Sequence, residues 1–465
     1  MPGLLLVGVA VGGNRLDVRC AGGTITGIGS GLVARRGETV VRGATTVLPG
    51  LHDHHLHLMA MAARSGSVDV GGVTGTRELA RTLGDASARL PAGAWLRAVG
   101  YHETTGGTLD RRALDAMVTD RPVRVQHRSG HQWILNSPAC RALGLEHESD
   151  PGLERDDAGD LTGRLLDRDD WIAERLPRGD PPDLGAVGRR LASYGVTGVT
   201  DATPTRTGAD LEVLAGARRT GTLRQRVRVM GTVEDGAAVP GELEPGPVKV
   251  MVSDGADPDV DGLAGRIEGA HGSGRPVALH AVTRVAAALA LAAWDRAGSR
   301  SGDRLEHGAV LAPDVVDRLA GLGVTVVTQP SFVAERGDEY LAEVEPGDVP
   351  YLYPCAGLDR AGVGLGGGTD APFGPEDPWT AVAAAVRRVT RTGHVLGPAE
   401  RLDPGRALGL FLSDPPSPGG PARTVRVGGP ADLCLLDGDL RLVLEDPSSA
   451  HVVATVIDGE LVHQR

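Results

Sequence analysis

Four histidines crowd one short segment near the start of the chain, and their spacing is typical of a metal site. The segment PGLHDHHLHL contains two overlapping pairs, His52 with His54 and His55 with His57. Side chains two residues apart on a β-strand point to the same side, so such a pair at a strand end can offer two imidazoles to one metal ion. Because the two pairs are offset by an odd number of residues, only one pair can face a given site. A polar, histidine-rich loop is the alternative interpretation.

Three further residues of ligand type lie near the ends of apolar, strand-like runs. His280 lies in PVALHAV, His307 in RLEHGAV and Asp370 in GGGTDAP. Barrel enzymes made of parallel strands place their functional groups at such strand ends. Each residue taken alone also fits a structural role, as a hydrogen-bonded core histidine or, for the aspartate, as a helix N-cap or turn residue.

Lysine occurs once in the 465 residues, as Lys249, and the other 47 of the 48 Lys and Arg side chains are arginines. Lys249 lies inside PVKVMVSDG, with apolar residues on both sides. Burying a lone ammonium group is costly, so this lysine needs a partner or a covalent modification. Arginine could not replace it in chemistry that needs a free amine, because a guanidinium group stays protonated.

The spacing of these residues predicts the elements that position them. From Lys249 to His280 is 31 residues and from His280 to His307 is 27, and each interval fits one strand–helix unit. From His307 to Asp370 is 63 residues, which fits two units. From His57 to Lys249 is 192 residues, far more than three units need, so an insertion of about 100 residues is implied. The candidates would then lie on strands 1, 4, 5, 6 and 8 of the fold.

Short apolar β-type runs do alternate with helical runs rich in Ala, Leu and Arg along the middle of the chain. The predicted strands lie near residue 50 and at residues 195–202, 224–231, 247–255, 276–282, 304–310, 324–330 and 362–370. Eight parallel strands with helices between them indicate an α/β fold, a closed TIM-like (β/α)8 barrel. We expect this barrel at residues 49–404, with an insertion after its first strand at about 68–185.

Both chain ends instead show short β-type runs separated by glycine-rich turns. We therefore expect residues 1–48 and 405–465 to form one small β-sandwich domain together. Inside the expected insertion, the runs WLRAVGY and PVRVQHR are also typical of strands.

Composition excludes several classes of protein. The chain has a net charge of −12 and 3% aromatic residues, whereas nucleic-acid binders need basic surfaces and stacking rings. No apolar run reaches 18 residues, so we expect neither a transmembrane helix nor a membrane partner. The apolar start carries no Lys or Arg before it and is a poor signal peptide. With four widely spaced cysteines, these features favour a cytoplasmic protein with reduced thiols.

As a set, the motifs resemble the metal-dependent amidohydrolase superfamily, and within it the branch similar to N-substituted formamide deformylases. The resemblance runs from about residue 40 to the C-terminus. It rests on PGLHDHHLH, PVRVQHRSGHQWILNSPA, VKVMVSDG, VALHAV, RLEHG, VTQP, GGGTDAPFGPEDP and GGPADLCLLDGD. The family signature P-G-x-x-D-x-H-x-H matches Pro49, Gly50, Asp53, His55 and His57. This register implies that the second histidine pair binds metal and that the first pair does not.

The resemblance also implies two divalent metal ions and a role for each candidate. The implied ligands are His55, His57, Lys249, His280, His307 and Asp370. Lys249 would be carboxylated and bridge both ions, and Asp370 would bind the first ion and serve as the general base. His280 and His307 would bind the second ion.

A carbamate explains why an amine is needed at this position. Condensation of a neutral lysine with CO2 gives an anionic group whose two oxygens can hold two ions about 3.5–4 Å apart. A hydroxide that bridges the ions can exist at neutral pH and attack a carbonyl carbon. Zinc is the favoured metal for histidine and carboxylate ligands, although the ligand types also allow manganese, iron or cobalt.

The expected activity is hydrolysis of a non-peptide carbon–nitrogen bond in a small molecule, a linear amide or an N-formyl compound. The same site could act on a cyclic amide, a heterocyclic amine or a lactone, and a non-catalytic ligand-binding protein is a further alternative. Suitable residues at all six ligand positions disfavour the non-catalytic interpretation. Relatives often form dimers, so a homodimer is an expectation from the resemblance. The chain is shorter than most relatives, and LGLFLSDPPSPGGPAR lacks the usual threonine-rich helix start, which makes transfer of a relative's substrate unsafe.

Candidate substrate contacts are weaker than the metal-ligand candidates. They are His131, Trp133, Gln329 and Tyr101. A packed aromatic ring or a hydrogen-bonding loop residue is an equally good interpretation of each.

Overall fold

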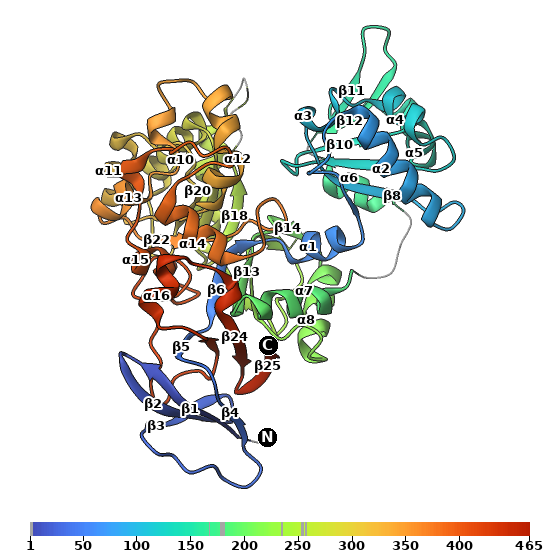
Figure 1. Cartoon of the computed structure of the whole chain (residues 1–465). Coiled ribbons are helices and arrows are strands. Elements are labelled where there is room, and N and C mark those ends of the chain that lie inside the picture. Colours follow the sequence, from blue (N-terminus) through green and yellow to red (C-terminus); the bar gives the residue numbers. More distant parts are fainter. Residues whose placement is uncertain (1–2, 167, 177–181, 234–235, 253–254, 256–257) are drawn as a thin grey trace. The chain divides into compact units, whose positions relative to one another are not determined.

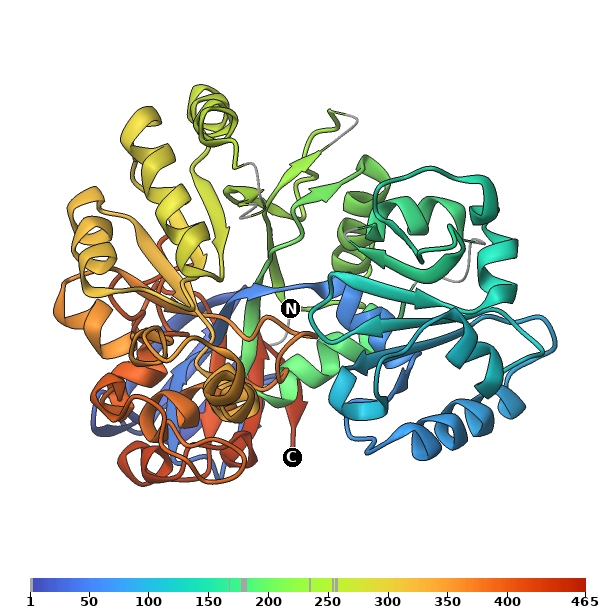
Figure 2. The same cartoon turned by 90° about the horizontal axis from the view of Figure 1, so that it is seen from above.

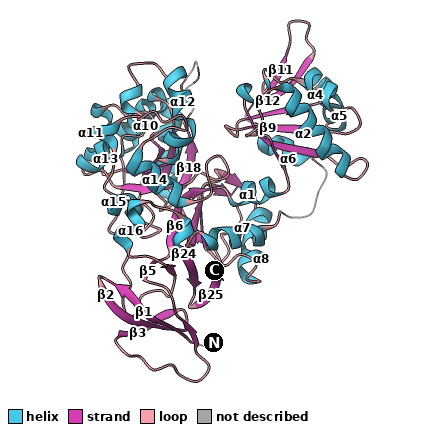
Figure 3. Cartoon of the chain, in the orientation of Figure 1, coloured by secondary structure: helices cyan, strands magenta, loops and turns pink. Residues whose placement is uncertain are grey.

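The structure of the chain is a computed structural model that describes residues 3–166, 168–176, 182–233, 236–252, 255 and 258–465 (Figure 1). The chain divides into two compact units, Met1–Leu58 with Leu184–Arg465, and Met59–Asp183. Both units mix helices and strands (Figure 3). Within the described ranges, no helix is long and apolar enough to cross a membrane.

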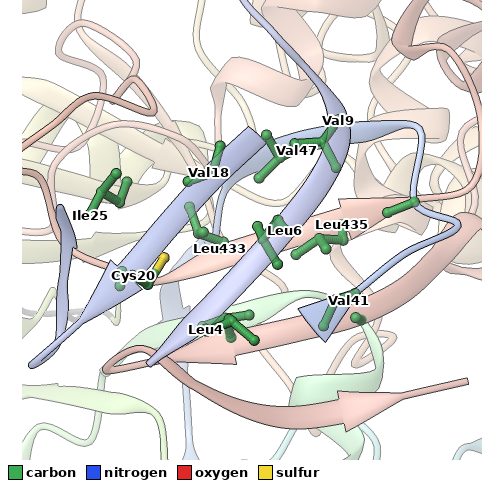
Figure 4. Close-up of a cluster of buried hydrophobic side chains, with 14 residues drawn as sticks. Leu4, Leu6, Val9, Val18, Cys20, Ile25, Val41, Val47, Leu433 and Leu435 are labelled. Carbon is green, nitrogen blue, oxygen red and sulfur yellow. The ribbon is translucent and has the colours of Figure 1, made fainter. Parts of the chain in front are cut away.

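Strands from both chain ends share one sheet of the first unit. Its order is β25-β24-β23-β5-β1-β2-β3, with β4 beside β1, and β5 pairs antiparallel with β23. The strands are β1 (Leu4–Val11), β2 (Asn14–Ala21), β3 (Thr24–Gly29), β4 (Thr39–Val41), β5 (Thr46–Pro49), β23 (Leu433–Leu436), β24 (Val452–Ile457) and β25 (Glu460–Gln464). Leu6 and Val9 of β1 gather with Leu433 and Leu435 of β23 in a buried apolar cluster (Figure 4). The hydrogen bonds define a single sheet here, so the sandwich packing stays a prediction.

The parallel strands expected in the middle of the chain are present, in two sheets. Their orders are β17-β15-β13-β6 and β18-β19-β20-β21-β22, and every pairing in them is parallel. The strands are β6 (Leu51–Leu56), β13 (Val196–Asp201), β15 (Arg226–Val229), β17 (Glu244–Pro245), β18 (Val248–Met251), β19 (Val277–Ala281), β20 (Arg304–His307), β21 (Thr325–Thr328) and β22 (Leu365–Gly367). A further short pair is β14 (Thr205–Arg206) with β16 (Thr232–Val233). Residues 253–254 of the run predicted at 247–255 lie outside the described residues.

The sequence predicts one closed barrel sheet, whereas the strand ladders of the described residues stop at two places. At one place Pro247 precedes β18 and has no N–H to donate, and a hydrogen bond of 3.0 Å runs from Gly231 N to Pro247 O. At the other place β22 has only three residues. After β22, Asp370 N donates a hydrogen bond of 2.8 Å to His55 O, and Ala371 O accepts one of 2.8 Å from His57 N. Backbone hydrogen bonds therefore cross from one sheet to the other at both places.

Helices follow most of these strands, as the alternating pattern predicts. In Figure 2, the helices coloured yellow to orange lie on the outer side of the strands to which they connect. The helices of the first unit are α7 (Leu184–Ser193), α8 (Gly208–Arg219), α9 (Val260–Gly272), α10 (Arg284–Ala297), α11 (Pro313–Leu322), α12 (Ser331–Glu343), α13 (Cys355–Arg360), α14 (Pro378–Arg387), α15 (Pro404–Gly409) and α16 (Leu440–Glu445), with short 3₁₀ turns at Val349–Tyr351, Pro398–Glu400 and Ser449–His451.

Helix α10 shows how the local sequence sets these elements. The Thr283 side chain accepts a hydrogen bond of 3.0 Å from Ala286 N and caps the helix start. The alanines and leucines that follow favour helix, and Gly298, with φ of 76°, ends it. Trp294 is fully buried on the inner face, where its Nε1 donates to Asp303 Oδ2 at 3.1 Å. The helix is thereby tied to the loop before β20.

The second unit has a six-stranded sheet of its own, in the order β11-β12-β10-β9-β8-β7. Its strands are β7 (Val68–Asp69), β8 (Leu96–Tyr101), β9 (Val123–His127), β10 (Gln132–Leu135), β11 (Leu153–Arg155) and β12 (Leu161–Leu166). Its helices are α1 (Leu58–Ser65), whose first residue belongs to the first unit, α2 (Thr76–Arg89), α3 (Glu103–Gly106), α4 (Arg111–Met117), α5 (Ser137–Ala142) and α6 (Asp169–Arg175), with a 3₁₀ turn at Leu145–His147. The predicted strands WLRAVGY and PVRVQHR are confirmed as β8 and β9. Leu79 and Leu83 of α2 pack with these strands in a buried core.

Candidate metal centre

Strand β6 carries His52, His54 and His55, His57 follows it directly, and the two histidine pairs have different partners. His52 Nε2 lies 2.9 Å from Thr200 Oγ1, and His54 Nε2 lies 3.0 Å from Ser413 Oγ. His55 lies instead among the other ligand candidates. All six residues of the strand are buried, so each imidazole needs a polar partner. The odd offset between the pairs therefore separates two environments within one short strand.

His55, His57 and Asp370 form a cluster in which one ligand atom of each residue lies within 4.8 Å of the others. Asp370 Oδ1 lies 3.5 Å from His55 Nε2 and 3.3 Å from His57 Nε2. Ligand atoms held about 2.0–2.1 Å from a tetrahedral zinc ion lie about 3.3–3.4 Å from one another. Both the chemistry of the donors and their separations therefore fit a divalent metal ion.

The other three candidates adjoin this cluster. Lys249, on β18, has its Nζ 3.2 Å from His55 Nε2. The ring of His307, the last residue of β20, has its centroid 4.8 Å from that of His55 and 4.4 Å from that of His280 on β19. All six candidate ligands thus come together, from five parallel strands and the segments that directly follow them.

Burial sets the charge of these groups. It lowers the pKa of the Lys249 ammonium group, against the opposing effect of the Glu306 and Asp370 carboxylates. Burial and the neighbouring charge of Lys249 hold the pKa of His55 well below its usual value. Burial raises the pKa of Asp370, but the hydrogen bond from His57 and the nearby histidines and lysine outweigh it and lower that pKa. Neutral imidazole and ionised carboxylate are the forms that bind metal.

Two of the candidate ligands have left-handed backbone conformations. The φ angle is 68° at His307 and 54° at Asp370. A residue with a side chain costs about 1–3 kcal/mol in such a conformation and keeps it only where the surroundings enforce it. Strain of this kind is concentrated at functional sites, and here it affects two residues of one cluster.

Glu306 is a residue of this site that the sequence analysis missed. It is fully buried, contacts His55 Nδ1, and accepts a hydrogen bond of 3.1 Å from Arg304 Nη2. Arg304 also donates to His54 O at 2.7 Å. A partner on Nδ1 leaves the other ring nitrogen of His55 free to bind metal and fixes the ring orientation. The signal was available as an Arg and a Glu two residues apart inside a buried strand, where unpaired charges are too costly.

Asp53, within β6, is hydrogen-bonded to the segment after β22. Its carboxylate accepts hydrogen bonds from His55 N (3.0 Å), Thr369 N (3.1 Å) and Thr369 Oγ1 (2.5 Å). Gly368 permits the close approach, since a Cβ there would lie 2.5 Å from His55 Cβ and 2.9 Å from His55 N. These contacts place Asp370 beside the histidines.

The predicted substrate contacts are divided between the two units. Gln329, just after β21, is fully buried, and its Oε1 lies 2.8 Å from His307 Nδ1, so it orients a candidate ligand. Tyr101, Trp133 and His131 belong to the second unit. The Tyr101 hydroxyl donates to Gly107 O at 2.5 Å and accepts from Leu109 N at 2.9 Å.

Trp133 lies in a buried core cluster of the second unit, with the guanidinium groups of Arg97 and Arg124 over its ring. His131 is exposed, and its backbone N donates to Ser129 Oγ at 3.3 Å. Tyr101 and Trp133 therefore have packing roles, and substrate contact by any of the four candidates stays a prediction.

Known proteins resemble the chain over nearly its whole length. The Bacillus subtilis protein provisionally named amidohydrolase YtcJ is 25% identical over 92% of this chain and 91% of its own. The N-substituted formamide deformylase of Arthrobacter pascens is 25% identical over 96% of this chain and 95% of its own. Among solved structures, an uncharacterized metal-dependent hydrolase from Pyrococcus horikoshii has a TM-score of 0.76 and 21% identity, covering 97% of this chain and 99% of its own.

The family assignment rests on a match to the family's sequence profile. The sequence profile of the amidohydrolase family matches residues 44–463, which include every candidate metal ligand. The chain is therefore a hydrolase that belongs to the amidohydrolase family.

Proposed function

We propose that the chain hydrolyses a non-peptide carbon–nitrogen bond, an amide or N-formyl bond, in a small molecule, with the help of two divalent metal ions. The observation that carries this proposal is the approach of His55 Nε2, His57 Nε2 and Asp370 Oδ1 within 4.8 Å of one another, with Lys249 Nζ beside His55. Its relative named N-substituted formamide deformylase supports the substrate class.

The donor set supports a binuclear zinc centre. The residues that would hold the ions are His55, His57, Lys249, His280, His307 and Asp370. Imidazole and carboxylate donors suit zinc at a site that also admits water or substrate. When bound there, divalent ions acidify a water molecule and polarise a carbonyl oxygen.

Lys249 would serve as a carbamate that bridges the two ions. Its buried amine, with its lowered pKa, is nucleophilic in the neutral form. The amine nitrogen would attack the carbon of CO2, form a nitrogen–carbon bond and lose one proton to solvent. The carbamate would carry a negative charge, and its oxygens would serve as metal ligands.

Asp370 would move the proton during hydrolysis. Its carboxylate is ionised, because its pKa is lowered despite its burial. It would accept a proton from the attacking water at a carboxylate oxygen and pass it to the leaving nitrogen. Glu306 and Gln329 would hold the rings of His55 and His307 through their Nδ1 atoms.

We further propose that the two parallel sheets are the two parts of one (β/α)8 barrel. The hydrogen bonds from Gly231 to Pro247 and from Asp370 to His55 support this arrangement, since they run where a barrel would close. The shared sheet of β1–β5 and β23–β25 supports a small terminal domain. The compact unit Met59–Asp183 supports an insertion after the first barrel strand.

The substrate class is tested by a hydrolysis screen of the purified protein over N-substituted formamides, acyl amides, cyclic imides, heterocyclic amines and lactones. We expect turnover of formamides or linear amides, with close to two divalent ions per chain by elemental analysis. Turnover confined to the other classes would replace the proposed substrate. Protein that binds no metal and hydrolyses none of these compounds would contradict the whole proposal.

The carbamate is tested by equilibrating the protein with ¹³C-labelled CO2 and recording ¹³C NMR spectra. Because Lys249 is the only lysine, the Lys249→Arg variant provides a baseline in which only the N-terminal amine can react. We expect a carbamate carbonyl signal in the wild type that the variant lacks, together with loss of nearly all activity in the variant. The exposed Arg318→Lys change is the matched control and should leave activity unchanged. Normal turnover by Lys249→Arg would refute the carbamate.

A further inference from the structure

A second group of side chains that could bind a metal ion belongs to the second unit and shares no residue with the proposed centre. It consists of His102, Glu103 and His127, which offer ligand atoms that all lie within 4.8 Å of one another. Glu103 Oε2 is 3.6 Å from His102 Nε2 and 3.4 Å from His127 Nε2. The two imidazole rings have their centroids 5.3 Å apart. The proposed reaction assigns no role to these three residues, and none of them is among the six implied metal ligands.

The fold of the second unit places the three residues together. Strands β8 and β9 are parallel neighbours, and Tyr101 at the end of β8 is paired with His127 at the end of β9. His102 and Glu103 follow β8 directly, so they leave the sheet beside His127. The carboxyl ends of parallel strands meet at one edge of a sheet, and this is where α/β proteins commonly bind ligands.

Neighbouring groups hold the His127 ring in place. Its Nδ1 lies 2.8 Å from Ser129 Oγ and accepts a hydrogen bond of 3.1 Å from Ser129 N. The Tyr101 ring contacts it edge-on, with centroids 6.0 Å apart. With Nδ1 occupied in this way, the Nε2 atom is the one that faces Glu103. Metal-binding histidines commonly donate from the far ring nitrogen to an acceptor, and Ser129 Oγ is the acceptor available to Nδ1 here.

The separations fit a metal ion between the three side chains. Ligand atoms about 2.0–2.1 Å from a tetrahedral zinc ion lie about 3.3–3.4 Å apart, close to the two separations measured at Glu103. Imidazole nitrogens and a carboxylate oxygen are the ligands that zinc and related ions prefer.

We propose that His102, Glu103 and His127 bind one divalent transition-metal ion, with zinc as the preferred ion. The histidine side chains are 14% and 16% exposed and that of Glu103 is 52% exposed, so the site opens to solvent on the carboxylate side. Three protein ligands leave a fourth position for water or for an anionic or carbonyl group of a ligand. The chain would then hold one ion more than the proposed binuclear centre accounts for.

The first test locates the ion without any change to the protein. Crystals of the full chain, grown with zinc, are measured on both sides of the zinc absorption edge. We expect an anomalous peak between His102 Nε2, His127 Nε2 and Glu103, in addition to any peak at His55 and His57. A map with a peak at His55 and His57 but none between His102, His127 and Glu103 would overturn the proposal. A map with the reverse pattern would uphold it and contradict the binuclear centre instead.

The second test counts ions in solution. The full-length protein is stripped with a chelator, reloaded with zinc, freed of excess metal and measured by elemental analysis. The variant His102→Ala with His127→Ala should lose one ion per chain, and Glu103→Gln, at an exposed position, should weaken zinc binding at this site at least about tenfold. His147→Ala, an exposed histidine of the same unit, is the matched control and should lose none.

The His55→Ala and His57→Ala double variant separates the two sites, because it should lose ions of the proposed centre and keep the one at His102. Circular dichroism establishes that each variant is folded. An unchanged ion count in both the His102/His127 and Glu103 variants would refute the site and leave a hydrogen-bonded His–Glu–His cluster.

Discussion

Replacement of Glu306 by glutamine should destabilise the first unit strongly, although the side chains have nearly the same shape. Glu306 and Arg304 are 0% and 2% exposed, and the carboxylate contacts both the Arg304 guanidinium group and His55 Nδ1. Glutamine has only one acceptor oxygen, and its NH2 group would replace an oxygen that accepts hydrogen bonds, such as the one from Arg304 Nη2. The change therefore leaves the Arg304 charge buried without a counter-charge.

The expected cost follows from the burial of both groups. Removing one partner of a buried ion pair costs about 3–5 kcal/mol, and about 1.4 kcal/mol is a tenfold change in an equilibrium constant. The ratio of folded to unfolded protein should thus fall by roughly two to four powers of ten. Loss of the partner of His55 should also weaken metal binding about 10–100-fold.

Guanidinium unfolding followed by circular dichroism measures the stability, and hydrogen exchange of peptides that cover β20 localises the loss to this strand. Competition with a chelator measures the metal affinity. Asp295→Asn is the control, because it removes a charge from the exposed pair with Arg318 and should cost less than about 1 kcal/mol. Adding Arg304→Gln to Glu306→Gln should recover part of the stability, since the stranded charge is then removed.

The reasoning would be refuted if Glu306→Gln unfolded within about 1 kcal/mol of the wild type, as an exposed pair would, and bound metal equally well. That result would mean that water reaches the pair or that the guanidinium group has another acceptor.

Three further changes test other parts of the site. Gly368→Ala should lower the melting temperature and the metal content together, because its Cβ would lie 2.5 Å from His55 Cβ; an unchanged melting curve would argue against this close approach. Arg206→Met should move acid unfolding to higher pH. Asp201 is buried and lies 2.9 Å from Arg206, which lowers the pKa of Asp201 against the effect of burial. The stability that the ionised Asp201 contributes is lost as pH falls through its folded-state pKa. Without Arg206 that pKa rises, so the loss begins at higher pH. Circular dichroism against pH measures this shift, and an unmoved midpoint would contradict it. Asp370→Asn should keep part of the bound metal while turnover falls about 10²–10⁴-fold, and undiminished turnover would assign the base elsewhere.

Much of the fold could be predicted because its signals are local. Strands such as β19 and helices such as α10 are encoded by continuous apolar runs, a threonine cap and a glycine end. The metal-ligand candidates could be placed on particular strands because a strand–helix unit has a nearly constant length. The ladder breaks could not be predicted in this way, since they depend on where Pro247 and the short β22 meet their neighbours.

The roles of several single residues depended on contacts that sequence patterns do not contain. Glu306 was passed over because a carboxylate inside a strand is informative only when its partners are known, here Arg304 and His55. Tyr101 and Trp133 lie in buried clusters of the second unit, and substrate contact by either stays a prediction. A ring that contacts substrate and a ring that fills a core have the same local sequence signal.

By itself, the sequence determined the alternation of strands and helices, the histidine pairs two residues apart and the one amine among 47 arginines. These features repeat at short distances along the chain, so periodicity and residue chemistry reveal them. Only the tertiary structure decided which atoms meet: His55 with Lys249 and Glu306, and His102 with His127. Such contacts join residues far apart in sequence, and they depend on strand register and on the cost of leaving a buried charge or imidazole without a partner.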